Sequence, residues 1–90
     1  MVDMAGALRR HSEALANLAS QEMGKPIVQA RAEIGTCAAL SIWCAEYGTA
    51  FLANEAAGEG PNAYVSYLTI GAALGVAPWN FPLWHLTGPG

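Results

Sequence analysis

Hydrophobic residues recur at helical spacing near the start of the chain. Apolar side chains return every three, four or seven positions, a spacing that places them on one face of a helix. They are Met4, Leu8, Leu15 and Leu18. Asp3 is suited to cap the start of this helix, and Gly24 provides a stop at its end. The pattern therefore predicts an amphipathic helix that ends near Gly24.

A second helix is predicted directly afterwards, since Pro26 suits the first turn of a helix. Its expected buried stripe is Ile27, Ala30, Ile34, Cys37 or Ala38, Ser41, Cys44 or Ala45, Gly48, and Phe51 or Leu52. Four polar side chains are expected off that stripe, namely Gln29, Arg31, Glu33 and Glu46. The two helices predict a helical hairpin over residues 1–53.

The pattern changes after residue 53. Residues 54–62 are rich in Ala, Gly, Glu and Asn, which favours a surface linker. Residues 63–68 alternate as a strand does, and residues 71–77 form a short uncharged run that ends at Pro78. Such a run is typical of a strand buried on both faces of a parallel sheet. We therefore expect an α/β fold in which residues 63–77 supply one or two strands, too few to form a stable sheet alone.

Composition indicates that more protein surrounds this chain. Hydrophobic residues make up 53% of the 90 residues and charged residues only 12%, a balance closer to the interior of a large protein than to a small domain. The basic residues form no cluster, which argues against a nucleic-acid partner. Polar residues and Pro78 interrupt the uncharged stretch 60–90, so no membrane span is expected. With no visible secretory signal, we expect a cytoplasmic protein.

Several side chains suggest chemistry that their surroundings do not support. Cys37 and Cys44 would lie about 10 Å apart along a helix, too far for a disulfide. Both fall on the apolar stripe, without a group to stabilise a thiolate or a zinc-binding pattern, so we expect reduced, buried thiols and no metal site. Lys25 lacks the glycine-rich cradle of a phosphate-binding lysine. Glu22 and Glu33 show no sign of forming an acid/base pair.

The segment with the clearest chemistry is Pro78-Trp79-Asn80-Phe81-Pro82. It follows the predicted buried strand, and ligands of open α/β sheets bind at the carboxyl ends of strands. The two prolines stiffen the loop, and the amide of Asn80 donates hydrogen bonds without carrying charge. The segment suits an oxyanion donor. The alternative is a rigid turn in which Trp79 fills a core.

The hexapeptide Pro78-Trp79-Asn80-Phe81-Pro82-Leu83 resembles a motif of the aldehyde dehydrogenase superfamily, in the first half of its cofactor domain. Upstream, residues 22–27, 29–34 and 43–48 resemble the helical hairpin of the NAD(P)-dependent succinate-semialdehyde dehydrogenase branch. The similarity runs from about residue 8 to residue 84. It implies a partial cofactor domain, with a helical hairpin followed by one or two strands, and NAD or NADP as the cofactor.

The resemblance also implies roles for three residues. Asn80 would be the oxyanion donor, and Pro78, Trp79 and Asn80 would contact the cofactor. In the family reaction a Cys thiolate attacks a small-molecule aldehyde, and the Asn amide and a backbone N–H hold the oxyanion. Hydride then passes to the cofactor, and a Glu activates the water that releases the acid.

The segments that carry the family's nucleophilic Cys, its general-base Glu and its phosphate-binding loop come later in the family. We therefore expect this chain to be inactive alone, an incomplete N-terminal segment that begins after the family's first strand and helix. Residues 78–90 would form the oxyanion loop and a divergent tail, since residues 85–90 depart from the family's helix as a shifted reading frame would. Leu68 and Thr69 also depart from the family pattern.

Three functions remain open. The chain is expected to be a segment of a succinate-semialdehyde dehydrogenase, or a non-catalytic module that docks on a full-length dehydrogenase by adding strands. In the third, a complementary chain supplies the missing groups of a split enzyme. The resemblance also places residues 63–68 near a subunit interface, consistent with a homo-oligomer. Without a partner, the uncharged strand region predicts poor solubility.

Overall fold

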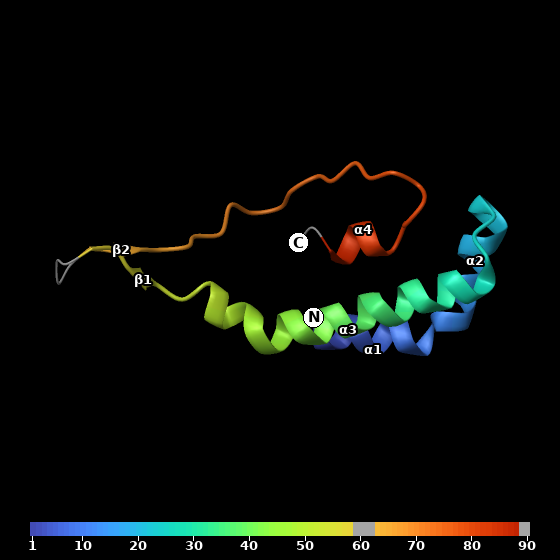
Figure 1. Cartoon of the computed structure of the whole chain (residues 1–90), viewed down its shortest axis with the longest axis horizontal. Helices are drawn as coiled ribbons and strands as arrows, with labels where there is room; N and C mark the ends of the chain where they lie inside the picture. The colour runs from blue at the N-terminus through green and yellow to red at the C-terminus, as the bar shows by residue number, and fades with distance from the viewer. Residues whose placement is uncertain (59–62, 89–90) are drawn as a thin grey trace.

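The computed structural model describes residues 1–58 and 63–88. Its elements are α1 (Val2–Arg10), α2 (Ser12–Met23), α3 (Ile27–Phe51), β1 (Glu55–Ala56), β2 (Tyr64–Val65) and α4 (Trp84–Thr87). The molecule is elongated, with extents of 57, 24 and 19 Å. α1 lies along α3 and α2 packs against α3 at an angle near its start, whereas the chain beyond α3 runs out to the β1–β2 pair and returns to α4 (Figure 1). The described part is thus mostly helical, with one two-stranded antiparallel sheet.

The first predicted helix is two helices. A bend at His11, with φ −104° and ψ 14°, separates α1 from α2, and both pack against α3. Met1 occupies the cap position of α1, and no side chain caps the helix. The prediction that Asp3 caps it is therefore wrong. Asp3 lies in the first turn instead, where its negative charge interacts favourably with the positive end of the helix dipole.

The buried residues of α1 and α2 are alanines. Ala5 and Ala16 are fully buried, and the predicted core positions Leu8 and Leu15 are half-buried. The prediction that Met4 and Leu18 face the core is wrong, since Met4 is 36% exposed and Leu18 48% exposed. Because small side chains allow two helix backbones to approach closely, the larger side chains beside them lie at the rim of the contact.

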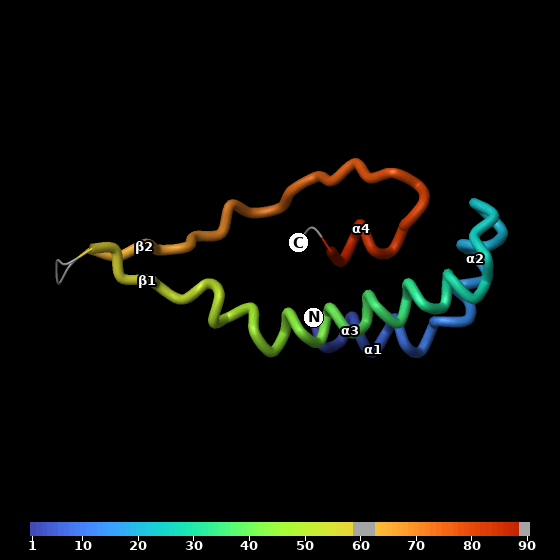
Figure 2. The backbone as a smooth tube through the Cα atoms, viewed as in Figure 1, coloured from blue at the N-terminus to red at the C-terminus, as the bar shows by residue number. Residues whose placement is uncertain are grey.

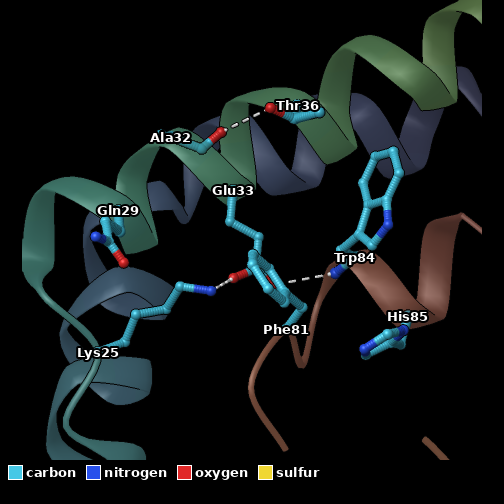
Figure 3. A pocket seen from close by; sticks show the side chains of 8 residues that line it. All are labelled: Lys25, Gln29, Ala32, Glu33, Thr36, Phe81, Trp84 and His85. Atoms are coloured by element: carbon cyan, nitrogen blue, oxygen red, sulfur yellow. Dashed lines mark hydrogen bonds and ion pairs between the residues drawn. The ribbon is translucent and has the colours of Figure 1, made fainter. Parts of the chain in front are cut away.

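The turn between α2 and α3 follows the sequence closely. Gly24 adopts the left-handed conformation with φ 71°, and its N–H bonds the carbonyl of Ser20, which confirms the predicted helix stop. Pro26 occupies the cap position of α3 rather than its first turn, with ψ 130°. Lys25 therefore lies between a left-handed glycine and an extended proline, and its side chain leaves the turn beside α3 (Figure 3).

The middle of α3 carries the predicted buried stripe. The buried positions are Ala30, Ile34, Cys37, Ala38 and Ser41. The prediction is wrong for two large apolar residues at the end of the stripe and for one charged residue. Phe51 and Leu52 are exposed because the last turns of α3 extend beyond α1 (Figure 1), while Glu33, expected off the stripe, is buried.

Among residues 1–58 and 63–88, strands form only in the β1–β2 pair. β1 lies inside the predicted linker 54–62 and pairs antiparallel with β2, with Glu55 opposite Val65 and Ala56 opposite Tyr64. The Tyr67 hydroxyl adds a hydrogen bond to the carboxylate of Glu55 at 3.1 Å. The predicted strand at 63–68 is therefore shortened to two residues, and the linker supplies its partner.

The second predicted strand, at residues 71–77, does not form. The chain from 66 to 77 returns from the hairpin as a single extended segment (Figure 2), and Leu74 and Val76 are 93% and 95% exposed. A strand needs a neighbour to satisfy its backbone N–H and C=O groups, and the described residues offer none here. The expectation of a strand buried on both faces is therefore wrong for this chain as folded.

The returning chain ends in α4, a single helical turn that packs against α3. Residues 85–87 are therefore helical where the sequence predicted a divergent tail, and Thr87 is buried. Residues 89–90 lie outside the described part. No helix in the ranges 1–58 and 63–88 is long and apolar enough to cross a membrane.

Candidate functional site

The loop that precedes α4 contains the three predicted site residues. Pro78, Trp79 and Asn80 lie where the extended segment turns back toward α3, and all three are exposed. Trp79 is 73% exposed, so the alternative in which its ring fills a core is wrong for this chain. The site is therefore a loop that presents an indole ring and an amide outward.

Lys25 holds this loop from the α2–α3 turn. Its Nζ donates a hydrogen bond to the backbone carbonyl of Asn80 at 2.9 Å and forms an ion pair with Glu33. The same ammonium lies 3.8 Å from the ring centroid of Phe81, a cation–π contact. The side chain of Lys25 is only 4% exposed. Lys25 therefore fixes the backbone of the residue that carries the predicted donor amide.

Glu33 holds the other end of the loop. One of its carboxylate oxygens bonds Lys25, and the other accepts the backbone N–H groups of Leu83 at 2.9 Å and Trp84 at 3.0 Å. These N–H groups lie at the start of α4, where a helix leaves donors without internal partners. Figure 3 shows Glu33 reaching from α3 toward both Lys25 and Trp84. One buried carboxylate thus joins the hairpin to the loop.

Electrostatics favour the ionised form of Glu33. Burial alone would raise the pKa of Glu33, but the hydrogen bonds from Lys25, Trp84 and Leu83 outweigh it and hold the pKa below its ordinary value. The carboxylate is therefore charged at neutral pH and able to accept all three bonds.

An apolar contact completes the attachment. The side chain of Leu83 packs against the buried cluster of Ala16, Ala30 and Ile34, which belongs to α2 and α3. The loop is thus held by a hydrophobic side chain and by the two charged groups described above. Because Asn80 lies between these anchors and Trp79, its backbone is restrained while its side chain stays exposed.

Sequence reasoning missed Lys25 and Glu33. The sequence pattern gives Lys25 no phosphate-binding role and Glu33 no part in an acid/base pair, and it does not bring the two together. A signal for Glu33 was present, because it follows Ala30 by three positions and precedes Cys37 by four, a spacing that places it on the buried stripe. A carboxylate is rarely buried without a partner. Lys25, the single lysine of the chain, is the cation that makes that burial possible.

A hollow of about 690 Å³ lies beside the ion pair. It is lined by Lys25, Gln29, Ala32, Glu33, Thr36, Phe81, Trp84 and His85 (Figure 3). A smaller hollow of about 450 Å³ is bordered by Pro78. The side chains of Trp79 and Asn80 line neither hollow. The structure therefore does not gather the three predicted residues into one cavity.

The cysteines are free thiols, as predicted. Burial raises the pKa of the Cys37 thiol, which disfavours a nucleophilic thiolate. Cys44 is half-buried. Within residues 1–58 and 63–88, no three His, Cys, Asp or Glu side chains gather as metal ligands. Cys37 therefore lacks the surroundings of a catalytic nucleophile.

The chain resembles known proteins along almost its whole length. Residues 1–88 match the model of the aldehyde dehydrogenase family. The succinate semialdehyde dehydrogenase of Escherichia coli strain K12, named for NAD(P)+, is 46% identical over 85 residues, which cover 93% of this chain and 18% of that protein.

Two further relatives carry similar names. A probable NADP+ succinate-semialdehyde dehydrogenase of Synechocystis is 35% identical, with 91% of this chain and 18% of that protein covered. An NADP+ succinate-semialdehyde dehydrogenase of Mycobacterium avium is 37% identical, with 90% of this chain and 18% of that protein covered. The chain thus spans 18% of the length of each of these three relatives. No solved structure gives a significant match.

Proposed function

The chain belongs to the aldehyde dehydrogenase family, and from this membership we propose that it is the oxyanion-donor segment of an enzyme that oxidises an aldehyde to a carboxylic acid. The proposed substrate is succinate semialdehyde and the proposed cofactor NAD or NADP, because the relatives that match the chain are named for them. Since the chain spans 18% of those relatives, the activity would belong to a longer assembly.

The observation that carries this proposal is the restraint of Asn80. Its carbonyl is held by the buried Lys25, while its side chain remains exposed. An oxyanion donor must be fixed before the reaction, so that no energy is spent on orienting it as charge develops. A neutral amide on a restrained loop meets this requirement, and it neither removes a proton nor adds charge.

The proposed chemistry requires groups from outside this chain. When a Cys thiolate adds to the aldehyde carbon, the carbonyl oxygen becomes an oxyanion that the Asn80 amide stabilises by a hydrogen bond. Cys37 is a poor candidate for that nucleophile because it is buried, and Cys44 is half-buried on α3. We therefore propose that the nucleophile and the general-base Glu lie outside these residues and that the chain alone is inactive.

The exposed loop also has side chains that could contact the nicotinamide ring of the cofactor. That ring would accept the hydride when the cofactor is bound. Trp79 offers an indole face that is 73% exposed, and Asn80 offers an uncharged donor. Pro78 restricts the backbone just before them. These properties fit an aromatic amide ligand, and we propose that these three residues contact it.

The proposed organisation of the chain keeps the predicted segments. Residues 1–53 are the helical hairpin, 54–62 the linker, 63–77 the strands, and 78–90 the oxyanion loop with its tail. Residues 66–77 follow β2 as one drawn-out segment (Figure 2) and have no neighbouring strand in the described part. We propose that they pair only within the complete enzyme, a cytoplasmic homo-oligomer or a pair of complementary chains.

A chimera tests this function. Residues 1–88 would replace the matching segment of the Escherichia coli relative, and succinate-semialdehyde oxidation would be followed through NAD(P)H. We expect activity, and we expect Asn80→Ala to lower kcat roughly 100- to 1000-fold. Asn17→Ala, at an exposed asparagine on α2, is the control and should leave kcat unchanged. A folded chimera whose kcat is insensitive to Asn80→Ala would contradict the assignment.

A second candidate function follows from the exposed segment 66–77. Its free backbone groups and apolar side chains suit docking on the sheet of an intact dehydrogenase by strand addition. In that case the chain should co-elute with the intact Escherichia coli relative in gel filtration. Separate elution, together with an active chimera, would favour the catalytic segment.

A further inference from the structure

Two buried charges hold the loop at the two ends of residues 80–84. Lys25 Nζ bonds the Asn80 carbonyl at 2.9 Å, and Glu33 accepts the N–H groups of Leu83 and Trp84 at 2.9 and 3.0 Å. The two charges also pair with each other. We call this arrangement the Lys25–Glu33 clamp. It joins positions 50 to 55 residues apart in the sequence.

The clamp fixes the orientation of the loop more than it stabilises the fold. Both side chains are 4% exposed, and removing two charges from water costs about as much as their attraction returns. A pair of apolar residues of similar size would pack at least as well. Such a pair would not, however, bond a carbonyl at one end of the loop and two N–H groups at the other. The charges therefore fix the loop in one orientation.

A second ion pair shows what a simple helix contact looks like here. Arg31 of α3 bonds Glu13 of α2 through two hydrogen bonds of 2.9 and 2.8 Å. Both side chains are more than half exposed, and the pair does not contact the loop. It joins helix to helix alone. Glu13 thus offers a matched control for Glu33.

We propose that Lys25 and Glu33 are positioning residues for the oxyanion donor, acting through the backbone of residues 80–84 to aim the Asn80 amide. This rests on the proposed role of Asn80. Neither residue touches the substrate. Lys25 acts on Asn80 directly through its carbonyl, while Glu33 holds Lys25 in place and secures the start of α4.

The first test measures the loop in the full 90-residue chain, without activity. Amide hydrogen exchange at residues 83–87 should become about tenfold faster or more in Glu33→Gln, because the loss of the charge breaks the pair with Lys25. Exchange in α3 should stay unchanged, and Glu13→Gln should leave residues 83–87 unchanged. Unaltered exchange at 83–87 in Glu33→Gln, or an equal increase throughout the helices, would overturn the clamp.

The second test uses the chimera and a double-mutant cycle. Lys25→Met should lower kcat roughly 10- to 100-fold, with little change in KM for the aldehyde, because a small misplacement of a catalytic group has effects of this size. Lys25→Arg should restore much of the rate. In Asn80→Ala, adding Lys25→Met should cost little more, since the donor it aims is gone. Lys25→Met/Glu33→Gln, which leaves no unpaired buried charge, repeats the test in a variant that keeps the fold.

The outcomes separate the two proposals. Losses that are simply additive in the cycle would overturn the positioning role while leaving Asn80 as a donor. A kcat unaffected by Asn80→Ala would overturn both the donor role of Asn80 and the positioning role of Lys25 and Glu33. This holds even if hydrogen exchange still shows that the clamp protects the loop. Non-additive losses with rescue by Lys25→Arg would support the proposal.

Discussion

The helical hairpin and the extended segment 66–77 are both rich in apolar side chains, yet only the hairpin buries them. Ile34 in α3 is 1% exposed, whereas Ile70 and Val76 are 94% and 95% exposed. Hydrophobicity alone therefore does not decide which region forms a core. The difference lies in how each region satisfies its backbone.

A helix bonds its own N–H and C=O groups, so a second helix needs only to cover one apolar face. α1 and α2 do this for α3. A strand leaves its backbone groups for a neighbour, and residues 66–77 have no neighbouring strand within the described part. A short segment of a large sheet can therefore keep its helices while its strands remain open.

The largest effect expected from this comparison is at Ile34. Ile34→Ala removes a fully buried side chain between Ala16 and Ala30, which should lower the free energy of unfolding by about 2 to 4 kcal/mol. Leu74→Ala is the matched change in the extended segment, where Leu74 is exposed, and should cost less than about 0.5 kcal/mol. Urea unfolding followed by helical circular dichroism measures both. Equal losses would show that the extended segment is packed after all.

A smaller effect is expected from acid. The folded-state pKa of Glu33 is lowered, so its contribution to holding the loop is complete above the unfolded pKa of about 4.3 and is lost as pH falls through the lower folded value. Lys25, Cys37 and His85 are the other titratable groups near this carboxylate. The amide resonances of Leu83 and Trp84 should stay constant from about pH 7 to pH 5 and move only in stronger acid. Movement of these resonances between pH 7 and pH 5 would contradict the assignment to Glu33.

The smallest effect on folding is expected at Val76. Val76→Lys places a charge on an exposed segment without strand pairing, which should change the free energy of unfolding by less than about 0.5 kcal/mol. It should nevertheless reduce self-association, because a charge on an open edge blocks pairing between copies. Gel filtration of both proteins at matched concentration checks this. If the parent chain elutes as a monomer, residues 66–77 do not drive the self-association that the sequence predicts.

The sequence predicted what depends on local spacing and missed what depends on partners. The helix stop at Gly24 and the buried Ile34 follow from backbone preference and periodicity, so both were predicted correctly. Residues 71–77 do not form a strand because strand formation depends on a neighbour that residues 1–58 and 63–88 do not provide.

The candidate site shows the same division. Asn80 could be proposed from its motif, because the amide and the flanking prolines are visible in the sequence. The clamp could not, since Lys25 and Glu33 meet residues 50 to 55 positions away. Glu33 is expected off the buried stripe, and its burial depends on the pairing with Lys25 that only the fold shows.

Residue-resolved amide hydrogen exchange on the unmodified chain tests the central claim most directly. If the hairpin folds by itself and holds the Asn80 loop, the core of α3 should be the best protected, and Trp84 and Thr87 should show measurable protection. Residues 66–77 should exchange at the rate of an unstructured chain. Protection of 71–77 equal to that of α3, or an unprotected α4, would contradict the account.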